Sequence, residues 1–166
     1  MTPTLRAKSG AKIAVVIIAV AATGLLYAIA ATPAGAGTAT CRGFAATITG
    51  TSGSDQLRGT IGRDVIVARG GADQIEGRDG NDLICAGGGS DQVLAGRGRD
   101  SVFGGAGLDQ IAGGNGPDRL RGQRDDDELE GNRGDDHLTG GGGFDIGFGG
   151  VGSDTCTGVD FSVSCA

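Results

Sequence analysis

The chain has 166 residues, of which 36 are glycine, five are phenylalanine, one is tyrosine and none is tryptophan. So few large side chains leave no room for a separate globular domain with its own core. Twenty acidic residues against fourteen Lys and Arg give a formal net charge of −6, which argues against nucleic acid as a partner.

The first 36 residues have the pattern of an export signal. The beginning contains Arg6 and two lysines, residues 13–31 are apolar, and residues 34–36 are the small residues expected before a cleavage site. The apolar stretch of nineteen residues is also long enough to span a bilayer, so an uncleaved anchor is the alternative. Cleavage would leave eleven Arg and all twenty acids, a formal charge of −9. We predict a secreted, extracellular protein, or else a membrane-anchored one that faces outside.

A nine-residue repeat runs through residues 50–157 without an insertion and gives twelve frames, whose positions we number from one to nine. Position 1 is Gly or Ala in every frame, position 4 is Gly in eleven, and position 8 is Leu, Ile or Val in the first ten. Position 6 is aspartate throughout: Asp55, Asp64, Asp73, Asp82, Asp91, Asp100, Asp109, Asp118, Asp127, Asp136, Asp145 and Asp154. A flexible linker would not keep this phase, so the repeat predicts a solenoid.

The consensus of the frames, G-G-x-G-x-D-x-U-x with U an aliphatic residue, resembles the hemolysin-type calcium-binding repeat of the RTX family. The resemblance implies an all-β fold, a right-handed parallel β-roll (a β-solenoid) with two nonapeptide repeats per turn. It further implies that each Gly-rich turn binds Ca²⁺ and that each x-U-x unit is a short strand. We interpret the chain as an exported form of this family without a catalytic domain.

The residue types of each frame also suit calcium on chemical grounds. Ca²⁺ takes six to eight oxygen ligands, more than one carboxylate per frame supplies, so backbone carbonyls and the neighbouring turn must complete its shell. Glycine allows carbonyls to converge, because it accepts positive φ and has no Cβ. We therefore predict that the twelve aspartates are metal ligands and that up to about ten ions bind, roughly five on each edge of the roll. We also expect folding to depend on calcium.

Position 7 reveals a second period of eighteen residues. In the first four odd-numbered frames it is Gln56, Gln74, Gln92 and Gln110, whereas the even-numbered frames carry other residues. Two frames per turn explain this alternation, which predicts about six turns and two narrow parallel sheets. The glutamines should stack about 4.8 Å apart as an amide ladder.

Four cysteines in an exported chain predict two disulfides, for which three pairings are possible. Cys156 occupies an inward position 8, and Cys165 occupies position 8 of a degenerate thirteenth frame, so we pair these two across the last layer. Cys85 lies on the outer face of the even-numbered strands, where an apolar patch needs a cover. The segment from Cys41 to Ile48, with Phe44, could supply that cover, so we pair Cys41 with Cys85; free buried thiols are the alternative.

These patterns divide the chain into four parts. Residues 1–36 are the export signal or anchor, residues 37–49 an N-terminal cap, residues 50–157 the repeats and residues 158–166 a C-terminal cap. Catalysis is not indicated, since no G-x-S-x-G motif is present and a single histidine, His137, excludes H-E-x-x-H. We expect His137 to be a solvated surface residue and expect no small-molecule substrate.

Three functions remain to be compared. The first is a secreted calcium-binding protein, and the second is a cell-envelope adhesion or interaction module whose rigid roll meets an unknown cell-surface or protein partner. The third is ice binding by a flat row of threonines. The threonines of the even-numbered face are interrupted by aliphatic, Phe and Arg residues, which disfavours ice: Thr47, Thr49, Thr139, Thr155 and Thr157.

Overall fold

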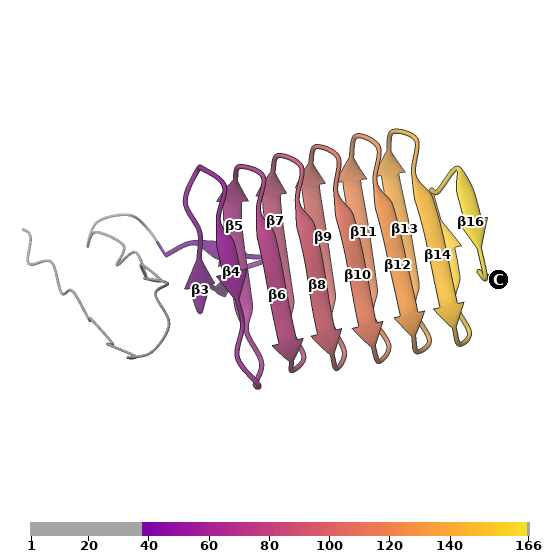
Figure 1. Cartoon of the computed structure of the whole chain (residues 1–166), viewed down its shortest axis with the longest axis horizontal. Helices are drawn as coiled ribbons and strands as arrows, with labels where there is room; N and C mark the ends of the chain where they lie inside the picture. The colour runs from indigo at the N-terminus through magenta and orange to yellow at the C-terminus, as the bar shows by residue number, and fades with distance from the viewer. Residues whose placement is uncertain (1–37, 166) are drawn as a thin grey trace, which may run out of the picture. The chain divides into compact units, whose positions relative to one another are not determined.

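Two parallel seven-stranded sheets form the roll in the computed structural model, which describes residues 38–165 (Figure 1). The odd sheet contains the strands of the odd-numbered frames: β4 (Gln56–Arg58), β6 (Gln74–Asp79), β8 (Gln92–Arg97), β10 (Gln110–Asn115), β12 (Glu128–Arg133), β14 (Ile146–Val151) and β16 (Phe161–Val163). The even sheet contains the others: β3 (Ile48–Thr49), β5 (Val65–Gly70), β7 (Leu83–Gly88), β9 (Ser101–Ala106), β11 (Arg119–Arg124), β13 (His137–Gly142) and β15 (Thr155–Thr157). The all-β parallel β-roll of about six turns is confirmed.

The predicted export signal or anchor, residues 1–36, lies outside the described residues. Within residues 38–165 the structure has no helix that is both long and apolar enough to traverse a membrane.

Neighbouring strands of each sheet are offset by eighteen residues, as the second period predicts. Gln56 lies beside Gln74, Gln74 beside Gln92, and Gln92 beside Gln110, and all four side chains are exposed. No hydrogen bond joins one glutamine side chain to another in the part of the chain that the structure describes. The eighteen-residue alignment of the glutamines is confirmed, whereas a hydrogen-bonded amide ladder is absent among the described residues, where solvent competes for exposed amides.

The aliphatic residues of position 8 fill the interior between the two sheets, where one residue in each x-U-x unit points inward. Nine of them are at most 4% exposed: Ile66, Ile75, Ile84, Val93, Val102, Ile111, Leu120, Leu129 and Leu138. At Gly147 this column lacks a side chain, and Val159 and Cys156 approach the space that a Cβ there would occupy, to 3.3 and 3.4 Å. The end of the core is therefore closed by residues that follow the repeats or belong to the last of them.

A short antiparallel hairpin, β1 (Thr40–Cys41) and β2 (Phe44–Ala45), covers the outer face of the even sheet near its N-terminal end. Cys41 is fully buried and packs on Val65, Val67 and Leu83. A disulfide joins Cys41 to Cys85, the pairing that the sequence suggested.

The hairpin covers the apolar patch without the aromatic residue that the sequence suggested, Phe44. Phe44 is 53% exposed and does not belong to the apolar cluster; the guanidinium of Arg63 lies over its ring instead. Phe103 is the aromatic residue at the edge of the cluster, with Arg42 and Arg121 over its ring at 5.2 and 5.0 Å. The prediction for Phe44 was wrong, because Cys41, tied down by its disulfide, already fills the space over the patch.

The C-terminal cap carries the second disulfide, between Cys156 and Cys165. The pairing agrees with the sequence prediction, but its assumed register does not. Strand β16 aligns Phe161 with Ile146 and Ser162 with Gly147, so the thirteenth frame is three residues shorter than the others. Cys165 therefore follows the last strand rather than occupying position 8.

Candidate metal sites at the edges of the roll

The position-6 aspartates form one column along each edge of the roll, because every frame places its loop before a strand of the same register. The odd column contains Asp55, Asp73, Asp91, Asp109, Asp127 and Asp145. The even column contains Asp64, Asp82, Asp100, Asp118, Asp136 and Asp154. Except for Asp55, which is half-buried, all are at most 4% exposed. Carboxylates are seldom buried to this degree without a partner.

A hydrogen-bond ladder fixes one oxygen of ten of the twelve carboxylates, all except Asp55 and Asp64. The backbone N–H of an aspartate donates to Oδ1 of the aspartate eighteen residues later, as from Asp91 to Asp109 at 2.9 Å. Ten such bonds, of 2.7–2.9 Å, run along the two columns. The ladder holds each carboxylate in one orientation, so the position of its second oxygen is fixed by the backbone of the preceding turn.

The second oxygen, Oδ2, is buried without any hydrogen-bond partner in ten of the twelve frames. These aspartates are Asp73, Asp82, Asp91, Asp100, Asp109, Asp118, Asp127, Asp136, Asp145 and Asp154. A buried, unpaired carboxylate oxygen is unfavourable by several kcal/mol unless a cation or a donor meets it. Ten such atoms at equivalent places indicate a ligand common to all of them.

Backbone carbonyl oxygens lie close to these carboxylates. A Cβ built on Gly104 would overlap Oδ2 of Asp109 and lie 2.9 Å from the carbonyl oxygen of Gly122. In residues 38–165 no group of three His, Cys, Asp or Glu side chains could hold a metal ion, so carbonyl oxygens must supply part of any coordination shell. The available donors are oxygens only, which suits a hard cation such as Ca²⁺.

Burial raises the pKa of nine of these aspartates, from Asp73 to Asp145 along the repeat, above the ordinary value of a carboxyl group. It raises the pKa of Asp82, Asp91 and Asp127 to about 6, and the pKa of Asp109 and Asp118 to about 7. The backbone N–H of the ladder lowers each pKa in part, and neighbouring aspartates of the column raise it further. Protons and cations therefore compete for the same oxygens near neutral pH.

This competition predicts how pH affects the calcium-free roll. A carboxyl whose pKa is higher in the folded than in the unfolded chain favours folding below the unfolded value, about 4. That contribution is lost as the pH rises through 6 and 7, the folded pKa values of Asp91 and Asp109. We expect the circular dichroism signal for β-structure of the chain in calcium-free buffer to increase as the pH is lowered from 7.5 to 4.5.

Asp109→Asn cannot titrate at this position and provides the control, because its β signal should increase less over the same range. With calcium in excess the trend should reverse, since protons displace the ion. A calcium-free β signal that falls steadily toward pH 4.5 would contradict the burial argument.

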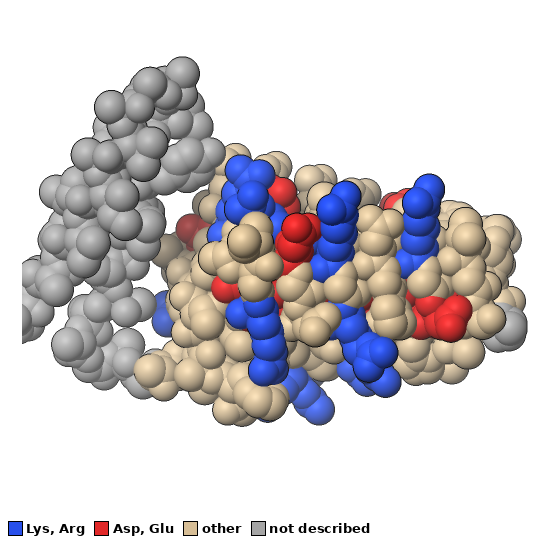
Figure 2. Space-filling model, turned by 90° about the horizontal axis from the view of Figure 1, so that it is seen from below, with Lys and Arg blue, Asp and Glu red and all other residues tan. Residues whose placement is uncertain are grey.

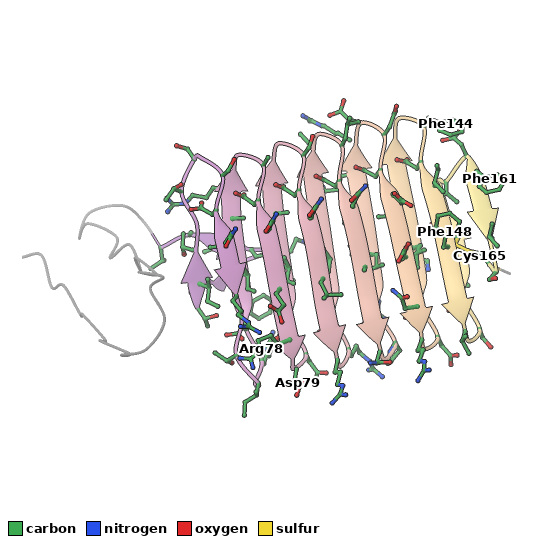
Figure 3. All side chains as sticks on the ribbon, viewed as in Figure 1. Arg78, Asp79, Phe144, Phe148, Phe161 and Cys165 are labelled. Carbon is green, nitrogen blue, oxygen red and sulfur yellow. A yellow bond between two sulfur atoms is a disulfide. The ribbon has the colours of Figure 1, made fainter. Side chains whose placement is uncertain are left out.

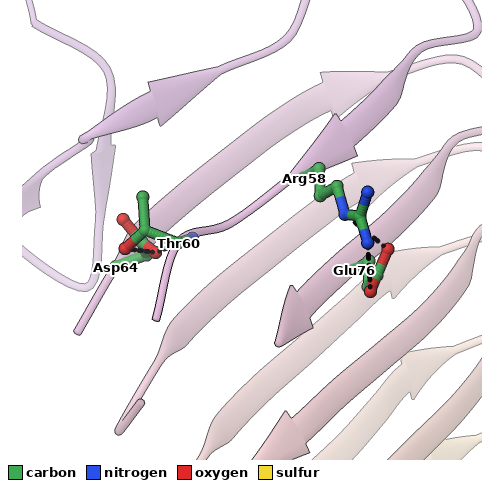
Figure 4. Close-up of polar contacts among 4 residues, drawn as sticks. All are labelled: Arg58, Thr60, Asp64 and Glu76. Carbon is green, nitrogen blue, oxygen red and sulfur yellow. Dashed lines mark hydrogen bonds and ion pairs between the residues drawn. The ribbon is translucent and has the colours of Figure 1, made fainter. Parts of the chain in front are cut away.

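In two frames Oδ2 of the position-6 aspartate does have hydrogen-bond partners. Thr60 donates its backbone N–H and its hydroxyl to Oδ2 of Asp64, at 2.7 and 2.9 Å (Figure 4). Thr51 does the same for Oδ2 of Asp55. The structure thus brings all twelve predicted aspartates into columns, but only ten of them present an unpaired oxygen.

Four further acidic residues accept backbone N–H groups at the edges in ways that the repeat pattern did not define: Asp125, Asp126, Asp135 and Asp160. Asp125, which replaces the position-4 glycine, adopts φ +69° and accepts a hydrogen bond at Oδ2 from the N–H of Gly107 at 2.9 Å. Asp160 accepts the N–H of Asp145 at 2.9 Å, although it follows by fifteen residues rather than eighteen. Sequence reasoning missed Asp160 because the shortened thirteenth frame breaks the spacing.

The outer surface of the edges carries both signs of charge. On the edge shown in Figure 2, arginine side chains project into solvent beside acidic ones. Arg78 and Asp79, labelled in Figure 3, are exposed at the end of β6. His137 is partly buried and lies 2.6 Å from the Thr155 hydroxyl, so it belongs to a polar row rather than being fully solvated.

Comparison with known proteins agrees with this geometry. A family model described as the RTX calcium-binding nonapeptide repeat (4 copies) matches residues 49–84, 86–120 and 121–156. No curated protein and no solved structure gave a match. Three matches that together span most of the chain, on a roll with aspartates in register along both edges, show that the chain belongs to the RTX calcium-binding repeat family.

Proposed function

We propose that the chain is a secreted calcium-binding protein that holds a row of Ca²⁺ ions along each edge of its β-roll. One observation carries the proposal: ten buried Oδ2 atoms, evenly repeated, have no hydrogen-bond partner. Calcium would supply the positive charge that these oxygens lack. Ten carboxylates that each have an unpaired Oδ2 are also consistent with binding of up to about ten ions.

The same arrangement supports calcium-dependent folding. Stacked aspartates one strand spacing apart repel each other by about 0.9 kcal/mol per pair in water, and more in a drier site. The glycine-rich loops lose much backbone entropy on folding. A cation between neighbouring turns would turn repulsion into attraction, so binding energy contributes directly to folding.

Export is supported by the two disulfides, Cys41–Cys85 and Cys156–Cys165, since such bonds persist in oxidising compartments. The signal-like pattern of residues 1–36 points in the same direction. The matched family describes a calcium-binding repeat rather than a catalytic domain, which fits a role without enzymatic activity.

Equilibrium dialysis against buffered calcium tests the proposal. We expect the unaltered chain to bind several ions and Asp109→Asn to bind at least one fewer. Asp79→Asn removes the same charge from an exposed residue outside the columns and should bind as many ions as the unaltered chain. A chain that binds no calcium, or an Asp79→Asn variant that loses as many ions as Asp109→Asn, would contradict the proposal.

An adhesion or interaction module is the second candidate, and exposed aromatic residues favour it. Phe144 and Phe161 are 57% and 54% exposed near the C-terminal end of the roll (Figure 3). A groove beside them is lined by Leu108, Phe144 and Ile146 together with acidic residues. Capture of a partner that requires calcium and is lost in Phe144→Ser would support this role. Ice binding is the weakest candidate, because Arg121 lies beside Thr139 and interrupts the threonine row.

A further inference from the structure

The first loop on each edge of the roll treats its aspartate differently from every later loop. Oδ2 of Asp55 accepts two hydrogen bonds from Thr51, from its N–H at 2.6 Å and from its hydroxyl at 3.0 Å. Oδ2 of Asp64 accepts the same pair from Thr60, at 2.7 and 2.9 Å (Figure 4). The equivalent atoms of the ten following frames are buried and unpaired.

The backbone at position 2 explains the difference. In the ten later frames this residue has positive φ: Arg69, Arg78, Gly87, Gly96, Gly105, Gly114, Gln123, Asn132, Gly141 and Gly150. Thr51 and Thr60 do not have positive φ, and a β-branched residue strongly resists that conformation. Threonine therefore keeps its N–H directed at the carboxylate and adds a hydroxyl that reaches the same oxygen.

These two loops are also the first on their edges of the roll, so neither packs against the loop of an earlier frame. Strands β5 to β14 run through the first three positions of the next frame, whereas β4 ends at Arg58 and no strand covers residues 59–61. Thr47 completes this end: its hydroxyl lies 3.1 Å from Oδ1 of Asp64 and accepts the N–H of Val65 at 2.9 Å. Threonines thus satisfy both oxygens of Asp64, in place of a preceding turn and a cation.

We infer that Thr51 and Thr60 close the first two loops to calcium, so that they form a metal-independent cap and ion binding begins at Asp73 and Asp82. This inference rests on the proposed calcium binding. It narrows the ligand set from the twelve aspartates of the repeat to ten. A threonine at position 2 is then the sequence signal for a loop that holds its aspartate without an ion.

The test compares two buried aspartates of the even column. Asp100→Asn should lower the number of calcium ions bound in equilibrium dialysis by at least one, whereas Asp64→Asn should leave it unchanged. If Asp64→Asn does not fold, Thr60→Val removes only the hydroxyl and should bind no fewer ions than the unaltered chain. Equal losses from Asp64→Asn and Asp100→Asn, or fewer ions in Thr60→Val, would overturn the inference.

A second measurement separates this inference from the proposed function. Thr60→Ser keeps the hydroxyl, so its thermal midpoint should stay above that of Thr60→Val, which loses a hydrogen bond to a charged group. If the unaltered chain binds no calcium, the proposed function fails, while the threonine contacts are still judged by these two midpoints. Equal midpoints would contradict the contacts themselves.

Discussion

Removing calcium from the chain is expected to abolish most of its far-ultraviolet circular dichroism signal for β-structure. The ten carboxylates whose Oδ2 has no hydrogen-bond partner would then be buried without a counter-charge. Each bound ion stabilises the folded state by about 2.7 kcal/mol when its free concentration is 100 times the dissociation constant. Because a domain is stable by only about 5–15 kcal/mol, the loss of a few ions equals the whole net stability.

The measurement is a calcium titration of the chelated chain, followed by circular dichroism at constant pH and ionic strength. The β signal should return cooperatively, and magnesium at the same concentration should restore less of it, since Mg²⁺ is reluctant to exchange its waters for a protein cage. A native-like β signal in excess chelator would show that calcium is not needed for folding. The equilibrium dialysis experiment would then decide separately whether the chain binds calcium.

Replacing Gly98 by alanine is expected to destabilise the calcium-loaded roll by about 2–5 kcal/mol, the combined effect of a strained φ and overpacking. Gly98 occupies position 4 with φ +132°, and a Cβ there would overlap the carbonyl oxygen of Gly80 in the preceding turn. That carbonyl belongs to the backbone and cannot move without shifting the neighbouring loop. Urea denaturation in excess calcium measures the effect.

Gly62 provides a matched control, because it occupies position 4 of a loop on the same edge. It lacks positive φ, and the nearest atom to an added Cβ is Oγ1 of Thr60 at 3.9 Å. Gly62→Ala should therefore change the stability by no more than about 0.5 kcal/mol. Equal destabilisation by the two variants would mean that close stacking of the loops does not explain the position-4 glycine.

The regular part of the fold could be predicted from the sequence for a physical reason. In a solenoid each repeat contacts mainly its neighbours, so one set of contacts recurs and the period of the sequence reports it directly. Position 8 marked the buried column from Ile66 to Leu138, and the eighteen-residue period gave the register of both sheets. The position-6 aspartates followed the same rule and form the two columns.

The pairing of the cysteines was also accessible from the repeat, because position within a frame determines which face a side chain occupies. Cys85 on the outer face required a partner from outside the repeats, and Cys41 provides it. The details of the cover were not accessible: Phe44 is largely exposed and does not join the apolar patch that it was expected to fill. Which residue of a short hairpin packs inward depends on how the hairpin docks, and no periodicity encodes that.

The sequence by itself thus determined the repeat, its two-frame turn, the aliphatic core and the aspartate at every loop. Only the tertiary structure decided which aspartates keep an unpaired oxygen, that Asp160 continues the odd column after a shortened frame, and that Thr51 and Thr60 serve the first two loops. All of these features lie at the ends of the roll. There a repeat lacks one neighbour, so its polar groups must be satisfied by residues that the period does not specify.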